Sequence, residues 1–159
     1  MAFSLTSPSI RPNSPIPAKY TSEGKNVSPP LTWSDVPAGT RSLALIIDDP
    51  DAPDPRAPRR TWVHWVVYNL PPDAAALPEA AASAGLPPGA REGLNDWQNI
   101  GYGGPAPPIG RHRYFHKLYA LDTVLPVSNV LDKEGVERAM KGHVLAEADL
   151  VATYQKGGA

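Results

Sequence analysis

The 159-residue sequence contains no cysteine, no excess of charge of one sign and no long hydrophobic run. The absence of cysteine excludes disulfide scaffolds, thiolate zinc sites and cysteine nucleophiles. Lysine and arginine number 15 against 16 aspartate and glutamate residues, so we expect no nucleic-acid partner. The first ten residues lack the regions of a signal peptide, and no apolar run is long enough for a transmembrane segment. We therefore expect a soluble, cytoplasmic protein.

Proline is the abundant residue, with 20 copies in a chain whose length suits a single domain spanning residues 1–159. An average protein contains about 5% proline. The prolines lie between apolar segments and do not form one tract, which predicts long, ordered loops. Functional residues are often found in such loops.

Several segments have the composition of β-strands, because they are rich in β-branched, aromatic or large apolar residues and end at Pro, Gly or Asp. The longer ones are residues 41–48, 62–70 and 112–121, and the shorter ones are residues 3–6 and 31–33. The continuous apolar run at 43–47 is typical of a strand covered on both faces, so we expect it at the centre of a sheet.

Helical signals are few. Residues 132–141 predict a short helix, with Asp132 as the N-cap and Gly142 as the stop. Residues 144–154 alternate in a way that favours a strand, although their composition would also allow a helix. The predicted fold class is mainly β: a β-sandwich, or a large sheet with a smaller second layer and one or two short helices.

Two predicted strands begin with an aromatic ring and an imidazole on the same face. Strict alternation places four residues of the first strand together, namely Trp62, His64, Val66 and Tyr68. In the second strand it groups His112, Tyr114, His116 and Leu118. We expect His116 to be structural and to lie deeper or at the far end, since four residues along a strand span roughly 13 Å.

Two loops add groups that can bind a ligand. Asp48, Asp49 and Asp51 follow the central apolar run, in a turn stiffened by prolines. The loop GYGGPAPPIG at residues 101–110 contains glycines whose amides could face a ligand. A metal is a rival interpretation, because Asp49, Asp51 and the histidines are legitimate ligand types, but no spacing specifies one and we expect no metal.

Several motifs together resemble the phosphatidylethanolamine-binding proteins, specifically their bacterial and archaeal Raf kinase inhibitor-like (YbhB/YbcL-type) branch. The motifs are DDPDAP at 48–53, WVHWVVYNLP at 62–71, and GYGGPAPPIGRHRY at 101–114 continuing into KLYALD at 117–122. Residues 20–45 and 139–154 extend the resemblance to nearly the whole chain. Members of the family often have cysteine where this chain has Ser22 and Ala106, and many have an aromatic residue where it has His116.

The resemblance implies a large central antiparallel sheet with a smaller sheet against it. It implies a pocket for phosphate, phosphate mimics or phosphorylated head groups, no cofactor, and a homodimer that modulates a partner enzyme such as a kinase or a protease. The pocket residues that carry over by motif position are Asp49, Asp51, Trp62, His64, Pro107, Pro108, His112 and Tyr114.

Elementary electrostatics assigns roles to these groups. Carboxylates repel phosphate, so we expect either that one of Asp49 and Asp51 is protonated or that they orient the histidines through hydrogen bonds. His64, His112 and loop amides would then meet the anion. A head-group ammonium could lie between the carboxylates and the face of Trp62. Two other function classes stay open: an enzyme that uses a histidine and an aspartate for general acid–base chemistry, and an interaction scaffold that acts through its proline-rich loops.

Overall fold

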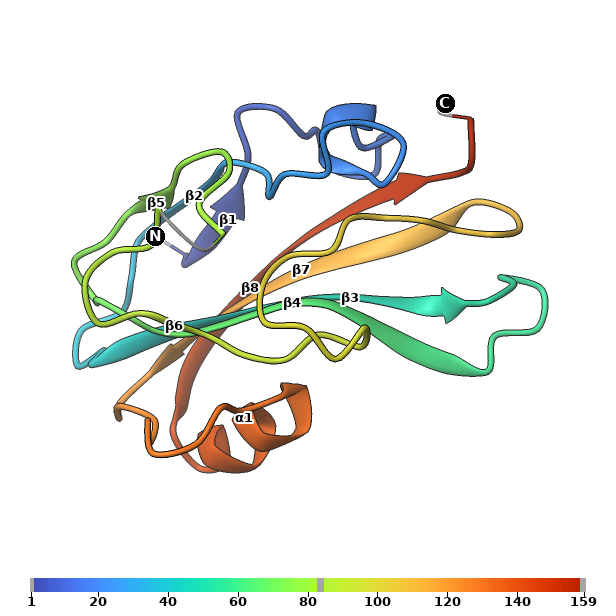
Figure 1. The fold of residues 1–159 in the computed structure, drawn as a ribbon. Helices are drawn as coiled ribbons and strands as arrows, with labels where there is room; N and C mark the ends of the chain where they lie inside the picture. The colour runs from blue at the N-terminus through green and yellow to red at the C-terminus, as the bar shows by residue number, and fades with distance from the viewer. Residues whose placement is uncertain (1, 83–84, 158–159) are drawn as a thin grey trace.

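A computed structural model describes residues 2–82 and 85–157 of the chain. Over these residues two antiparallel sheets and one α-helix form the structure (Figure 1). The larger sheet has the order β6-β4-β3-β7-β8 and consists of β3 (Ser42–Ala52), β4 (Arg60–Leu70), β6 (Arg91–Glu92), β7 (His112–Leu121) and β8 (Val144–Tyr154). The smaller sheet consists of β1 (Ser4–Thr6), β2 (Leu31–Ser34) and β5 (Ala76–Leu77). The mainly β fold class is confirmed.

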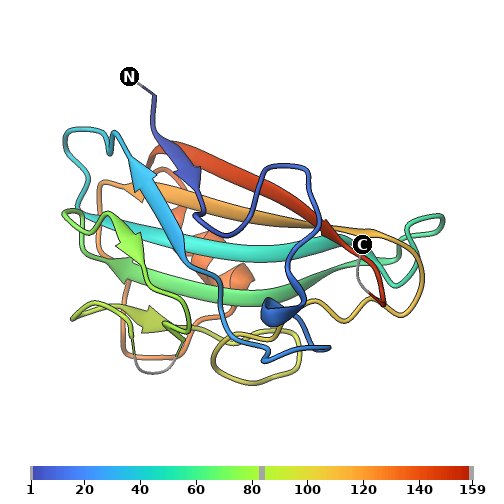
Figure 2. The same ribbon diagram turned by 90° about the horizontal axis from the view of Figure 1, so that it is seen from above.

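Strand β3 lies at the centre of the larger sheet, as its apolar run predicts. Leu43, Leu45 and Ile47 belong to the hydrophobic core on the side of the smaller sheet. Ala44 and Ile46 belong to a second core, on the side of α1 (Lys133–Met140). Figures 1 and 2 show the smaller sheet on one face of the larger sheet and α1 on the other. Both faces of β3 are therefore covered.

The helix and the last strand also agree with the sequence. The Asp132 carboxylate caps α1 by accepting a hydrogen bond from the Gly135 amide at 2.8 Å. Gly142, just beyond the helix, has a φ of +83°, which favours glycine. Residues 144–154 form strand β8, as expected, and pair with β7 along their whole length. A short 3-10 helix, η1 (Ala18–Tyr20), precedes β2.

One predicted face pattern is wrong, because β4 contains a β-bulge at His64. Ile47 of β3 pairs with Trp65, and the next residue, Asp48, pairs with Val63. His64 is therefore the inserted residue, and it points to the same side as Trp65. The bulge transfers Val66 and Tyr68 to the core beneath α1, opposite the face that Trp62 and His64 share.

Strand β3 is longer than predicted and includes the acidic residues expected in a turn. It continues through Asp48, Asp49 and Asp51, with Asp49 paired to Trp62. Asp48 points to the face of α1, where its Oδ2 accepts hydrogen bonds from Lys117 at 3.0 Å and Lys133 at 2.8 Å. Asp48 therefore ties α1 to the sheet and takes no part in the site on the opposite face.

Candidate ligand-binding site

A pocket of about 240 Å³ lies where the end of β3 meets the beginnings of β4 and β7. It contains all but one of the residues predicted for the site: Asp49, Trp62, His64, Pro107, Pro108, His112 and Tyr114. The remaining lining comes from Ala52, Pro53, Trp97 and Ala106. Because β3 is antiparallel to both neighbours, its last residues necessarily lie beside their first residues.

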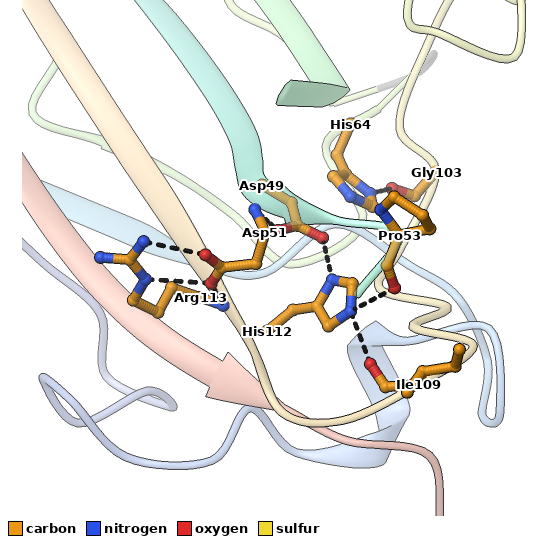
Figure 3. A network of polar contacts seen from close by, with 8 residues as sticks. All are labelled: Asp49, Asp51, Pro53, His64, Gly103, Ile109, His112 and Arg113. Atoms are coloured by element: carbon orange, nitrogen blue, oxygen red, sulfur yellow. Dashed lines mark hydrogen bonds and ion pairs between the residues drawn. The ribbon is translucent and has the colours of Figure 1, made fainter. Parts of the chain in front are cut away.

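Both ring nitrogens of the buried His112 contact oxygen atoms of the protein (Figure 3). Nδ1 lies 2.5 Å from Asp49 Oδ2, and Nε2 lies 2.9 Å from the Ile109 carbonyl oxygen and 3.1 Å from that of Pro53. Carbonyl oxygens only accept hydrogen bonds, so Nε2 carries a proton, and one further proton is shared between Nδ1 and Asp49. Burial raises the pKa of Asp49, although its hydrogen bond with His112 opposes this shift.

This geometry gives His112 a different role from the one expected, because it has no free nitrogen to donate to an anion. Instead, it joins the end of β3 to the loops that carry Pro53 and Ile109. The ring of His112 also stacks on that of Tyr114, with centroids 6.4 Å apart. We infer that it fixes the shape of the pocket wall.

Asp51 is the predicted residue that does not line the pocket. Its carboxylate accepts two hydrogen bonds from the Arg113 guanidinium, at 2.8 Å and 2.9 Å, and a third from the Arg113 backbone amide at 2.9 Å (Figure 3). The bonds from Arg113 hold the pKa of Asp51 below its usual value. Asp51 and His112 make no hydrogen bond in the structure, so Asp51 stabilises the strand ends and does not orient the imidazole.

His64 has one ring nitrogen without a partner, Nε2, and this nitrogen can only accept a hydrogen bond. Its Nδ1 lies 2.7 Å from the Gly103 carbonyl oxygen and therefore carries the proton of the neutral ring. The Gly103 amide in turn donates to the His64 carbonyl oxygen at 3.0 Å. Burial lowers the pKa of His64 to about 4, so the imidazole is neutral at pH 7. Its Nε2 then offers only a lone pair.

Tyr114 supplies the complementary group. Burial raises the pKa of its hydroxyl, which therefore keeps its proton at neutral pH. The rings of His64 and Tyr114 meet edge to face, with centroids 5.2 Å apart. In the described part of the chain, His64 Nε2 and the Tyr114 hydroxyl oxygen are the buried side-chain polar atoms without a hydrogen-bond partner. Both residues line the same pocket, which is unusual because buried polar groups are normally paired.

Aromatic rings surround the rest of the pocket. Trp97 meets both Trp62 and His64 edge to face, at centroid distances of 5.4 Å and 5.2 Å. The Arg60 guanidinium lies 4.6 Å from the centre of the Trp62 ring and already makes a cation–π contact there. Since Asp49 is also paired with His112, the carboxylate and aromatic groups proposed for a ligand ammonium are both engaged by the protein. Sequence reasoning missed Trp97, which follows no strand pattern.

The glycines of loop 101–110 permit close packing. A Cβ atom at Gly103 would lie 2.4 Å from the Trp97 ring, and one at Gly104 would lie 2.4 Å from Asn26 Oδ1. Both amides already donate within the protein, Gly103 to the His64 carbonyl oxygen and Gly104 to Asn26 Oδ1 at 2.8 Å. The Gly103 amide therefore holds the loop against β4, and the Gly104 amide holds it against the segment that carries Asn26. Neither amide is free for an anion, contrary to the expectation from sequence.

The other histidines lie outside the pocket. His116 is buried, its Nδ1 lies 3.0 Å from the Leu150 carbonyl oxygen, and burial lowers its pKa to about 4. His143 pairs with Asp122 on the surface at 2.8 Å. Across residues 2–82 and 85–157, no three His, Asp or Glu side chains are placed to hold a metal ion together. No helix in the same part of the chain is long and apolar enough to cross a membrane.

The protein is a small β protein with two antiparallel sheets and a pocket at the strand ends, and comparison with known proteins identifies its family. Residues 6–155 match the family described as phosphatidylethanolamine-binding protein. A UPF0098 protein of Methanothermobacter thermautotrophicus is 52% identical over 143 residues, which are 89% of this chain and 91% of the relative. The chain therefore belongs to the phosphatidylethanolamine-binding protein family.

Two solved structures of family members support the same assignment. A phosphatidylethanolamine-binding protein homologue from Chlamydia trachomatis superposes with a TM-score of 0.89 at 44% identity, covering 98% of both chains. The YbcL protein of E. coli, described as a member of the mammalian family, superposes with a TM-score of 0.88 at 35% identity, covering 98% of this chain and 99% of its own. The resemblance to the YbcL-type branch is thus confirmed.

Proposed function

We propose that this protein binds a small phosphate-like anion, either free or as the phosphorylated head group of a larger molecule, in the pocket between β3, β4 and β7. The observation that supports this most is the pair of unpartnered polar atoms, His64 Nε2 and the Tyr114 hydroxyl, in the wall of one pocket. Leaving a buried polar group unpaired costs about 1–3 kcal/mol. A ligand that pairs both groups recovers that cost.

The size of the pocket supports a small ligand. Its volume of about 240 Å³ is below the range of roughly 300–1,000 Å³ that is usual for sites of drug-sized molecules. Most of its lining is apolar or aromatic, with a few polar groups that can fix orientation. A phosphate group with a short substituent fits these dimensions.

Titration of isotope-labelled protein with inorganic phosphate, followed by heteronuclear NMR, tests the proposal. We expect saturable shifts at His64, Tyr114 and the neighbouring Trp97, and none at His143, which lies outside the pocket. Shifts confined to residues far from the pocket, or no saturation at millimolar phosphate, would show that the pocket is not an anion site.

Catalysis remains a second possibility, which the geometry supports less. Of the two histidines that line the pocket, only His64 has a ring nitrogen without a partner, and a histidine with a pKa of about 4 is a weak general base at neutral pH. His112 has both nitrogens engaged. If the wild-type protein turned over a phosphomonoester or another small substrate and His64→Phe did not, this result would favour an enzymatic function.

Regulation of a partner enzyme is a further part of the proposal, and it rests on the family. A kinase or a protease is the kind of partner that the resemblance implies, with the proline-rich loops as the contact surface. Ile109, which follows the two prolines of the pocket wall, is 55% exposed and suits such a contact. Inhibition of a panel of kinases and proteases by wild type, compared with Ile109→Asp, tests this part. Inhibition of none of them would argue against it.

The expected homodimer and cytoplasmic location also remain proposals. Native mass spectrometry of freshly purified protein would give the number of subunits and would show whether a phosphate or a lipid is retained. Fractionation of the producing cell would locate the protein. A monomer, or recovery outside the cytoplasm, would contradict the respective prediction.

A further inference from the structure

We infer that the pocket selects an oxyanion that keeps at least one ionisable proton, such as the monoanion of phosphate or of a phosphomonoester, over an oxyanion without a proton. The geometry points to this through two groups of opposite character, an acceptor at His64 Nε2 and a donor at the Tyr114 hydroxyl. The inference rests on the proposed function and specifies which phosphate-like ligands the site accepts. Phosphodiesters, sulfate esters and the dianions of phosphomonoesters, none of which has a proton to donate, would all bind more weakly.

The acceptor character of His64 is fixed by its surroundings. Nδ1 donates to the Gly103 carbonyl oxygen at 2.7 Å, and the Gly103 amide holds the same segment from the other side at 3.0 Å. The ring also lies between the rings of Trp97 and Tyr114, at centroid distances of 5.2 Å from each. A flip of the imidazole would break the bond to Gly103. Nε2 therefore needs a ligand atom that carries hydrogen.

The donor character of Tyr114 complements that of His64. The hydroxyl has one hydrogen to donate, and it stays protonated because burial disfavours the phenolate. An ionised phosphate oxygen accepts that hydrogen, while the P–OH group of the same phosphate donates to His64 Nε2. One tetrahedral group in its monoanionic form can satisfy both atoms. A group with oxygens that only accept would leave the lone pair of Nε2 facing negative charge.

The charge of the pocket supports a ligand of low charge. None of the described lining residues is lysine or arginine. The Asp49–His112 pair offers no free donor, and the Asp51 carboxylate and Arg113 neutralise each other outside the lining. The other titratable groups that influence His64 are Asp48, Asp96 and His116, of which the two carboxylates favour its protonation and His116 opposes it. A dianion would thus enter a nearly neutral, partly apolar site at a large cost in solvation.

The test compares methyl phosphate with methyl sulfate, which have the same shape. Near pH 6 about half of the methyl phosphate is a monoanion with one proton, because the second pKa of a phosphomonoester is about 6. Methyl sulfate is a monoanion without a proton at any pH in this range. Calorimetry on the wild-type protein from pH 8 to pH 6 measures both affinities without any substitution that might unfold the protein.

We expect the apparent affinity for methyl phosphate to rise roughly 50-fold from pH 8 to pH 6, following the fraction of ligand in the monoanionic form. Methyl sulfate should bind at least about tenfold more weakly than methyl phosphate at pH 6, because it leaves Nε2 without a donor. The ¹⁵N chemical shift of labelled His64 provides an independent readout. It should show an unprotonated, hydrogen-bonded Nε2 in the complex with methyl phosphate.

Other results distinguish a failure of the proposed proton selectivity from a failure of anion binding itself, the function on which the inference rests. Equal binding of methyl sulfate and methyl phosphate at pH 6 would overturn the inference and leave an anion site in place. The ¹⁵N signature of an imidazolium at His64 in either complex would also overturn it. Absence of binding by both ligands at every pH would overturn the proposed function itself. Tyr114→Phe should weaken methyl phosphate but preserve its preference over methyl sulfate, and loss of that preference would contradict the assignment of His64 as the selective group.

Discussion

Asp49 Oδ2 lies 2.5 Å from His112 Nδ1, and this contact joins the end of β3 to the beginning of β7. Both residues are buried, with 3% and 1% of their surfaces exposed. The opposite side of the ring faces the backbone carbonyls of Pro53 and Ile109. The His112 imidazole thus connects the end of β3 to the two loops that carry Pro53 and Ile109. Because both of its nitrogens are engaged, it lines the pocket without offering a nitrogen to a ligand.

Replacing His112 with alanine should destabilise the fold strongly. The substitution leaves the Asp49 carboxyl buried without its partner, and removing one member of a buried ion pair costs about 3–5 kcal/mol. Urea denaturation at pH 7 measures the change in the free energy of unfolding. His143→Ala is the matched control, because it removes the same side chain from a surface pair with Asp122 and should cost less than about 1 kcal/mol. Equal effects of the two substitutions would contradict the proposed role of His112.

The buried histidines should make the protein sensitive to acid. Burial lowers the pKa of both His64 and His116 to about 4, whereas an unfolded histidine titrates near 6.5. The unfolded chain therefore binds more protons between pH 6.5 and pH 4, so stability falls as the pH falls through this window. Each histidine should account for about 2 kcal/mol of loss between pH 7 and pH 5.

His116→Phe isolates one of these contributions. Its Nδ1 contacts the Leu150 carbonyl oxygen, and the phenyl ring that replaces the imidazole cannot take up a proton. The loss in free energy of unfolding between pH 7 and pH 5 should be about 2 kcal/mol smaller in this variant than in wild type. His143→Phe changes an exposed histidine and should leave the difference between the two pH values nearly unaltered. An unchanged acid sensitivity in His116→Phe would mean that His116 takes up its proton in the folded state over the same pH range as in the unfolded chain.

Much of the fold follows from patterns in the sequence, because they reflect burial directly. The run from Leu43 to Ile47 predicts the central strand, since a strand covered on both faces has no need of polar residues. Asp132 and Gly142 predict both ends of the helix for reasons of local hydrogen bonding and backbone conformation. These signals act within a few residues, so one sequence is enough to detect them.

Several details of the site depend on a β-bulge and on long-range hydrogen bonds. The alternation of side chains along a strand reveals neither of these features. The bulge at His64 inserts one residue into β4, and nothing in WVHWVVYNLP marks which residue is inserted. The sequence likewise groups Asp49 with Asp51, but a bidentate contact with Arg113 keeps Asp51 outside the pocket lining. Hydrogen-bond partners such as Gly103 for His64 join residues 39 positions apart. Such pairings arise only when the chain has folded.

Exhaustive chelation should change neither stability nor phosphate binding. The carboxylates and imidazoles that might have held a metal already have protein partners: Asp51 contacts Arg113, Asp49 contacts His112, and His64 Nδ1 contacts Gly103. Thermal denaturation before and after dialysis against EDTA measures the effect on stability, and calorimetry with phosphate measures the effect on binding. A fall in melting temperature that one particular divalent ion reverses would show that a metal contributes to the fold.

Replacing Tyr114 with phenylalanine should separate stability from binding. In the structure its hydroxyl is buried without a partner, so removing the oxygen atom eliminates an unpaired polar group and keeps the stacked ring. The free energy of unfolding should stay the same or increase by about 1 kcal/mol. Phosphate affinity should fall roughly 10- to 150-fold, because the lost hydrogen bond has a charged acceptor in the complex and such bonds contribute about 1.5–3 kcal/mol.

Tyr119→Phe is the control for this experiment, since Tyr119 lies in the same strand but contacts the core on the side of α1. It should leave phosphate affinity unchanged, which shows that loss of a tyrosine hydroxyl elsewhere in β7 does not disturb the pocket. Urea denaturation and calorimetry on the two variants and wild type give all the required values. If Tyr114→Phe destabilised the fold by more than about 1 kcal/mol while phosphate affinity stayed constant, the hydroxyl would have a structural partner that the ligand does not replace. In that case the donor for the anion would have to come from elsewhere in the pocket wall.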